Sequence, residues 1–169
     1  MLKLMRGLGM ILDVTHLAEE SFWEALEVFD GPVMASHNNC RALCDGERQF
    51  RDEQIKALIA RDASIGVAFD AWMLHPDWCE DPKRPNPARL SQVVDNIDHI
   101  CRLAGDTLHA AIGSDLDGGY GREQSPADLD TIADLQKLPG MLAERGYSAS
   151  DIANVMHGNW LRLFQRALG

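Results

Sequence analysis

Short apolar runs alternate with amphipathic segments over the first part of the chain. Residues 10–16 (MILDVTH) and 32–37 (PVMASH) have the composition of buried strands, and residues 19–29 repeat apolar side chains at helical spacing. The Asp-Gly-Pro sequence at 30–32 is typical of the end of a helix. The chain is therefore predicted to begin with a strand, a helix and a second strand.

The same alternation continues towards the C-terminus. Asp52 is predicted to cap a helix with its apolar face at Ile55, Leu58 and Ile59, and residues 71–88 are predicted to form a long loop. Ser148, with Asp151 three residues later, is predicted to cap the last helix. The remaining elements are strands at 64–69 and 109–113 and helices at 90–103, 129–142 and 149–167.

Four strands that alternate with helices predict an α/β fold with a parallel sheet, because parallel neighbours need a crossover connection. A closed (β/α)8 barrel takes about 250 residues, and this chain has 169. Half of a barrel and an open four-stranded sheet are both compatible with this length. No internal repeat or linker divides the sequence, so residues 1–169 are interpreted as one partial domain.

Composition narrows the class of protein. Apolar residues make up 46% of the chain, enough for a core, and 26 acidic residues outnumber 16 basic ones, which argues against a nucleic-acid partner. The four cysteines form no CxxC pair and are interpreted as reduced thiols. No apolar stretch approaches the roughly 20 residues of a membrane span. We therefore expect a cytoplasmic protein with no membrane partner.

The most informative side chains are His16 and His37, which close the first two predicted strands. The carboxyl ends of parallel strands are where α/β barrels carry their chemistry, and neutral imidazoles suit zinc and similar metals. Two such histidines from adjacent strands could therefore share one metal ion. The alternative is that each is a hydrogen-bonded side chain at a strand terminus.

Asp115 is the corresponding acidic side chain after the fourth strand, within the glycine-rich segment 113–119. A carboxylate beside a metal-bound water can take up its proton and pass it to a leaving amine. Alternatively, the segment is a turn-forming or calcium-like Asp-x-Asp-Gly loop. Arg48, in the loop after His37, could bind a substrate carboxylate in a bidentate pair, or it could be solvated surface.

The other histidines are expected to be structural. His75 has the His-x-Asp spacing of a metal motif but lies in a loop, and the rest lie in helices or at the opposite end of a strand, namely His99, His109 and His157. Trp72 and Trp78, in the long loop, either cover the site or pack the loop.

Six short motifs, taken in order, resemble the membrane (renal) dipeptidase family of metal-dependent hydrolases in the amidohydrolase superfamily. The resemblance covers nearly the whole chain, and the 21-residue step from His16 to His37 fits the family pattern. The motifs are DVTH at 13–16, ASHNNCR at 35–41, Arg48 with Asp52, DHI at 98–100, GSDLDG at 113–118 and GNWLR at 158–162.

The resemblance implies a fold and a set of roles. The chain would be the C-terminal half, about strands five to eight, of a TIM-type (β/α)8 barrel, and would begin inside the helix before strand five. His16 and His37 would hold one zinc of a two-zinc site. Arg48 would bind the C-terminal carboxylate of a dipeptide substrate, and Asp115 would contact the water and the substrate amine and carry the proton.

The family's remaining site residues are missing from this sequence. The His-x-Asp pair and bridging glutamate that hold the other zinc, and a further substrate-binding histidine, belong to the earlier half of the barrel. We therefore predict a zinc dipeptidase whose isolated 169-residue chain is inactive and needs an N-terminal half. The alternative is a non-catalytic half-barrel, with two open sheet edges, that assembles with a partner chain or as a homodimer. Another amidohydrolase, such as a metal-dependent deoxyribonuclease, fits neither the net charge nor Arg48.

Overall fold

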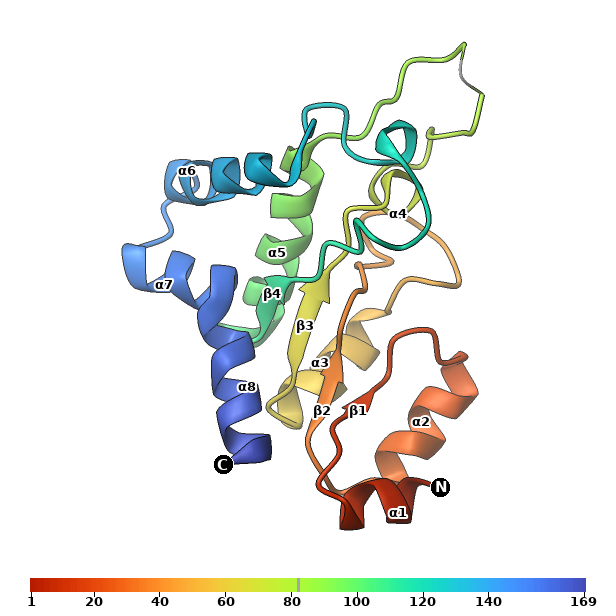
Figure 1. The fold of residues 1–169 in the computed structure, drawn as a ribbon, viewed down its shortest axis with the longest axis vertical. Coiled ribbons are helices and arrows are strands. Elements are labelled where there is room, and N and C mark those ends of the chain that lie inside the picture. The colour runs from red at the N-terminus through yellow and green to blue at the C-terminus, as the bar shows by residue number, and fades with distance from the viewer. Residues whose placement is uncertain (82) are drawn as a thin grey trace.

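The computed structural model describes residues 1–81 and 83–169. Their centre is a parallel sheet whose four strands follow one another in chain order, β1 (Leu12–Asp13), β2 (Val33–Ala35), β3 (Ser64–Val67) and β4 (Ala110–Ile112). Every connection therefore moves one strand in the same direction, as in the wall of a barrel (Figure 1). The predicted α/β fold with a parallel sheet is confirmed.

Helices connect and cover the strands (Figure 1). The α-helices are α1 (Leu2–Gly7), α2 (Glu19–Val28), α3 (Asp52–Ala60), α4 (Ala71–Leu74), α5 (Leu90–Ala104), α6 (Leu138–Glu144), α7 (Ala149–Ala153) and α8 (Asn159–Leu168). Two 3-10 turns span Arg122–Gln124 and Ile132–Lys137, and a π-helical turn at Asn154–Gly158 joins α7 to α8. Helices α3, α5 and α8 all pack against β3.

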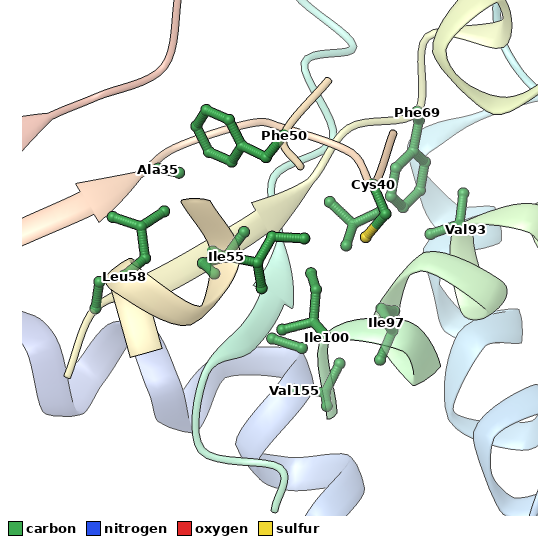
Figure 2. Packing of buried hydrophobic residues seen from close by; sticks show 14 of the residues in the cluster. Ala35, Cys40, Phe50, Ile55, Leu58, Phe69, Val93, Ile97, Ile100 and Val155 are labelled. Carbon is green, nitrogen blue, oxygen red and sulfur yellow. The ribbon is translucent and has the colours of Figure 1, made fainter. Parts of the chain in front are cut away.

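The hydrophobic core lies between the sheet and helices α3 and α5 (Figure 2). Helix α5 presents Val93, Ile97 and Ile100, which recur at helical spacing, and all three are fully buried. Ile55 and Leu58 of α3 meet them from the neighbouring helix. Burial of one such side chain contributes about 1.5–3 kcal/mol, so this packing fixes the strands on which the site residues are carried.

The structure differs from the predicted elements where local geometry intervenes. The first strand is only two residues long, because the chain turns after Val14 and His16 adopts a φ of +67°. Arg51, rather than Asp52, is the N-cap of α3, and its backbone N–H donates to the Gln54 side chain. Helix α4 lies in the predicted long loop, and at four residues it is too short to give a periodic signal.

The last two predicted helices are interrupted. Residues 132–137 form a 3-10 turn before α6, which has a proline in its first turn, and the π-helical turn divides the final helix. The predicted cap is confirmed, because Ser148 Oγ accepts the Asp151 N–H at 3.2 Å and the Asp151 carboxylate accepts the Ser148 N–H at 3.0 Å.

Two glycines draw the carboxyl ends of the strands together. A Cβ atom at Gly66 would lie 2.1 Å from the Ser36 carbonyl oxygen, and one at Gly113 would lie 2.0 Å from the same atom. Only glycine leaves room for this approach. The ends of β2, β3 and β4 therefore converge directly beneath the residues that follow them.

The two edges of the sheet are not equivalent. Asn159 Nδ2 donates to the Ala110 carbonyl at 2.6 Å, and Trp160 Nε1 donates to the Ile112 carbonyl at 2.8 Å. The hydrogen bonds between β4 and β3 use the His109 carbonyl and the Gly113 N–H. Because alternate residues of a strand direct their backbone groups to opposite sides, the Ala110 and Ile112 carbonyls face away from β3. The expectation of two open edges is therefore wrong for β4, where side chains of α8 occupy the edge acceptors.

Among the helices that the structure describes, none is both long enough and apolar enough to cross a membrane.

Candidate functional site

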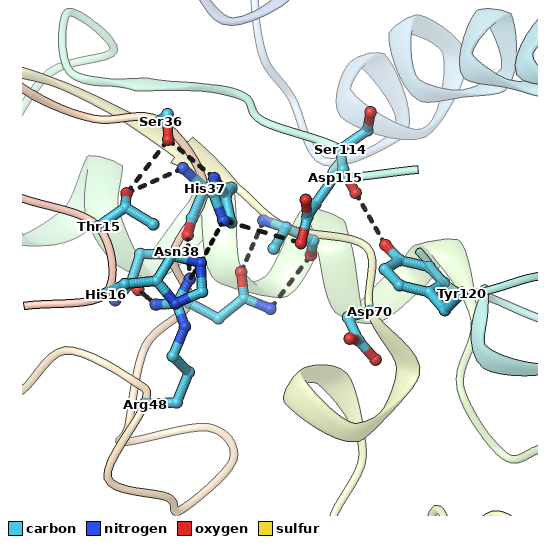
Figure 3. Close-up of polar contacts among 12 residues, drawn as sticks. Thr15, His16, Ser36, His37, Asn38, Arg48, Asp70, Ser114, Asp115 and Tyr120 are labelled. Carbon is cyan, nitrogen blue, oxygen red and sulfur yellow. Dashed lines mark hydrogen bonds and ion pairs between the residues drawn. The ribbon is translucent and has the colours of Figure 1, made fainter. Parts of the chain in front are cut away.

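A cleft of about 480 Å³ lies at the carboxyl ends of the strands and is lined by a residue that follows each of them. His16 follows β1, His37 follows β2, Asp70 follows β3 and Asp115 follows β4 (Figure 3). Arg48 also lines the cleft. The fold thus brings all four residues singled out in the sequence to one place, and it adds Asp70.

The two histidines face each other through the same ring atom. Their Nε2 atoms are 3.0 Å apart, and their rings meet edge to face at 67°. Two nitrogens bound to one tetrahedral zinc at 2.0–2.1 Å would be separated by about 3.3 Å, so the pair fits two positions of such an ion. Within residues 1–81 and 83–169 there is no group of three or more His, Cys, Asp or Glu side chains that could hold a metal. The donor set present here is therefore partial.

His16 is held in an unusual backbone conformation beside Arg48 and His37. Its φ of +67° lies in the left-handed region, which turns the side chain from the end of β1 towards His37. Partial burial, the positive charge of Arg48 and the proximity of His37 all lower the pKa of His16. The imidazole is accordingly neutral at neutral pH, which is the state that a metal ion binds.

Arg48 is anchored to the backbone that carries His37. Its Nη2 donates to the His37 carbonyl at 2.9 Å and lies 3.5 Å from His16 Nε2, and its Nη1 donates to Asn38 Oδ1. Burial lowers the pKa of Arg48, and nearby carboxylates, Asp115 foremost, oppose that effect. A guanidinium has five N–H donors, so donors remain that can reach a carboxylate in the cleft.

Asp115 stands opposite the histidines on the β4 side. Its Oδ2 lies 3.8 Å from His37 Nε2, and both side chains are about one-fifth to one-quarter exposed. Its φ is +57°, and a Cβ at Gly118 would lie only 2.7 Å from Asp115 Oδ1. Among the described residues no hydrogen-bond donor occupies this carboxylate, so it is available to a bound molecule.

Asp70 is a site residue that the sequence interpretation missed. It is 6% exposed and accepts hydrogen bonds from the Trp72 indole at 2.7 Å and from Gln124 Nε2 at 2.8 and 2.9 Å. Burial raises its pKa. Its position directly after the buried strand 64–69 was the available signal. Its bond to Trp72 also places that indole at the cleft, whereas Trp78 Nε1 bonds to the Glu123 carbonyl at 3.5 Å.

Tyr120 is a second residue that the sequence interpretation missed. It lines the cleft beside Asp70 and Asp115, and its hydroxyl donates to the Ser114 carbonyl at 3.3 Å (Figure 3). Burial raises its pKa, as do the charges of the two aspartates. It therefore stays protonated and holds the loop that carries Asp115.

The other histidines lie outside this cleft. His99 Nε2 pairs with Asp52 at 2.7 Å, and His109 Nδ1 contacts the Ala63 carbonyl at 2.9 Å. His75 Nδ1 accepts the Asp77 backbone N–H at 3.1 Å, which is a local turn. His157 is exposed within the π-helical turn. These contacts agree with the structural roles expected for them.

Residues 1–168 match the family model for membrane dipeptidase, peptidase family M19. An uncharacterized protein in the pqqA 5′ region of Klebsiella pneumoniae is 31% identical over 165 residues, which are 98% of this chain and 58% of that protein. Dipeptidase tcpJ of Claviceps purpurea is 29% identical over 98% of this chain and 36% of that protein.

Solved structures give the same result. Dipeptidase AC, a metallopeptidase of family M19, superposes with a TM-score of 0.86 at 26% identity, over 99% of this chain and 47% of that one. The chain also superposes on a metallopeptidase from Rhodobacter sphaeroides that is liganded with a phosphinate mimic of the dipeptide L-Ala-D-Ala. The TM-score is 0.85 at 25% identity, over 98% of this chain and 45% of that one.

The present chain spans between 36% and 58% of the length of these relatives, which agrees with a partial barrel. With the family model matched over almost every residue, the chain belongs to the membrane dipeptidase family, peptidase family M19.

Proposed function

We propose that this chain supplies one half of the active site of a zinc-dependent dipeptidase. The observation that carries the proposal is the convergence of His16, His37, Arg48 and Asp115 on one cleft, in a chain that belongs to a dipeptidase family. In this proposal His16 and His37 would hold a zinc ion. When bound, zinc would supply a Lewis acid that polarises a peptide carbonyl and lowers the pKa of water.

Arg48 binds and orients the substrate in this scheme. A dipeptide has a free carboxylate, and a guanidinium anchored through two of its N–H groups still offers others for a bidentate pair. Because this contact lies at the histidine side of the cleft, it fixes the peptide bond near the Nε2 atoms. The ligand of the Rhodobacter sphaeroides relative, a mimic of L-Ala-D-Ala, supports a dipeptide as the substrate class.

Asp115 moves the proton. Its carboxylate lies across from His37 and is free of side-chain hydrogen bonds among the described residues, so it can accept a proton at one oxygen from the attacking water. The same oxygen can then donate that proton to the departing amine nitrogen, which restores the carboxylate. General acid–base transfer of this kind contributes about 10²–10⁴-fold to a rate.

We propose that further ligands come from a segment outside residues 1–169, because two histidines leave a zinc coordination shell incomplete. We propose that a second half-barrel supplies them, and that the second zinc of the family site is held there. The isolated chain is then inactive or nearly so.

The test compares the 169-residue chain alone with the chain co-expressed with the part of the Klebsiella pneumoniae relative that it does not match. Hydrolysis of L-Ala-D-Ala and other dipeptides is measured with added zinc. We expect no turnover by the chain alone and chelator-sensitive turnover by the pair. Asp115→Asn should reduce that turnover by about 10²–10⁴-fold, whereas the exposed neighbour Asp117→Asn should change it little. Equal turnover with Asp115→Asn and wild type would overturn the proposal.

The second candidate is a non-catalytic half-barrel, and the partial donor set favours it. It predicts that the co-purified pair, like the chain alone, hydrolyses no dipeptide even when metal is bound.

A further inference from the structure

One carboxylate oxygen links the residues that precede the two histidines. Asp13 is the last residue of β1, and its Oδ1 accepts the Thr15 backbone N–H at 3.0 Å and the Ser36 backbone N–H at 3.0 Å. Thr15 precedes His16 and Ser36 precedes His37. Asp13 thus fixes the two histidines relative to each other across the gap between two strands.

The side chains of Thr15 and Ser36 complete this link (Figure 3). Thr15 Oγ1 accepts the His37 backbone N–H at 3.2 Å and the Ser36 hydroxyl at 3.4 Å. Ser36 Oγ also lies 2.8 Å from His37 Nδ1. Burial raises the pKa of Asp13, but the hydrogen bonds from Ser36 and Thr15 more than offset this and lower it overall, so the acceptor is charged at neutral pH.

The Ser36 hydroxyl holds one ring nitrogen of His37 and leaves the other facing the cleft. Ser36 Oγ is nearer to His37 Nδ1 than to Thr15 Oγ1, at 2.8 Å against 3.4 Å. His37 Nε2 faces His16 Nε2 at 3.0 Å. A histidine whose second ring nitrogen is held in this way is oriented for a metal.

We propose that Asp13, Thr15 and Ser36 are positioning residues that hold the Nε2 atoms of His16 and His37 as one preformed pair of metal ligands. This inference rests on the proposed function, because it concerns the same metal. It adds that the geometry of the pair is set by residues that touch neither metal nor substrate.

Binding of Zn²⁺ to the purified 169-residue chain is measured by titration calorimetry, with zinc added to millimolar concentration. Loss of outer hydrogen-bond partners typically weakens metal binding by about 10–100-fold, so we expect this loss for Ser36→Ala and Asp13→Ala. Ser36→Thr and Asp13→Asn, which retain a hydroxyl and an acceptor oxygen, should restore most of the affinity. His16→Ala should abolish binding.

Asp106→Ala is the matched control. Asp106 Oδ1 also accepts a backbone N–H two residues ahead, that of Leu108 at 2.8 Å, but it lies before β4 and outside the cleft. Its substitution should leave zinc affinity within about twofold, because it lacks the contact to a metal ligand. Circular dichroism of each variant shows whether the fold is retained.

The ring ¹⁵N resonances of His37 provide a readout that a purely structural role would not change. Ser36→Ala should change the tautomer population of His37, because Nδ1 loses its hydrogen-bond partner. Wild-type zinc affinity and an unchanged tautomer in Ser36→Ala would overturn the inference, as would a wild-type chain that binds no zinc. If Asp13→Ala does not fold, the zinc affinity and the His37 tautomer of Ser36→Ala still test the inference. Zinc binding that depends on Ser36, together with a co-expressed pair that hydrolyses no dipeptide, would refute only the proposed function.

Discussion

At the scale of single residues, the site depends on two backbone conformations that residues other than glycine rarely adopt. His16 and Asp115 both have positive φ, at +67° and +57°. Such conformations cost of order 1–3 kcal/mol and persist where the surrounding structure determines them. Here each positive φ turns a side chain at the end of a strand into the cleft. The backbone strain at His16 and Asp115 is therefore a result of bringing these side chains together.

Arg48→Lys tests the carboxylate contact. An ammonium cannot form the bidentate pair of a guanidinium, so the KM of the reconstituted enzyme for dipeptides should rise about tenfold or more, with kcat little changed. Arg41→Lys is the control, since Arg41 also donates to backbone carbonyls, those of Gln49 and Glu47, but lies outside the cleft. A fall in kcat at unchanged KM would contradict the assigned role.

The sequence allowed His16, His37 and Asp115 to be predicted because each is a chemically distinctive side chain at the end of an apolar run. Asp70 has the same position but is followed by a helix too short to recognise, and its role depends on Gln124, 54 residues away. Roles that depend on such long-range hydrogen bonds cannot be read from local pattern. The link from Asp13 to Ser36, 23 residues apart, was missed for the same reason.

At the scale of elements, the strands and long helices follow from apolar periodicity, whereas the convergence of the strand ends depends on glycine. Gly66→Ala would place a methyl group against the Ser36 carbonyl and should lower the free energy of unfolding by about 1–3 kcal/mol. Gly140→Ala, within α6 and with no atom within 4 Å of the new methyl group, should raise it by about 0.5–1 kcal/mol. Urea unfolding of both variants measures the difference.

The 3-10 turn at 132–137 should respond to acid. Hydrogen bonds from Lys137, Thr131 and Asp130 lower the pKa of Asp134 from 3.8 to about 2. Because the folded pKa is depressed, this carboxylate stabilises the fold above pH 3.8, and the contribution is lost as the pH falls to about 2. Wild type should therefore unfold at higher urea than Asp134→Asn at pH 6, with the difference gone near pH 2. A difference that persists at pH 2 would contradict this cause.

At the scale of the whole molecule, helix α8 makes the two edges of the sheet different. The outward carbonyls of β4 are occupied by Asn159 and Trp160, whereas β1, the other outer strand, has β2 on one side only. The π-helical turn immediately before α8 packs against β4 and Asn154 within it bonds to Thr107. The π-helical turn therefore lies directly before Asn159 and Trp160, the two side chains that bond to the edge of β4.

The double variant Asn159→Leu, Trp160→Phe removes both donors and should expose β4. Each buried carbonyl left without a partner costs about 1–3 kcal/mol, and an exposed parallel edge promotes association. Light scattering across a range of concentrations should show species larger than those of wild type, while circular dichroism reports whether the fold is retained. An unchanged mass distribution in a folded variant would show that α8 does not limit association.

The difference between the two edges of the sheet affects how copies of this chain could pair with one another. A parallel sheet with two free edges can pair with another copy at each edge, and repeated pairing of this kind produces fibres. With the Ala110 and Ile112 carbonyls already bonded to α8, a strand that approached this edge would have to displace Asn159 and Trp160. The two donors of α8 would therefore disfavour open-ended growth through β4.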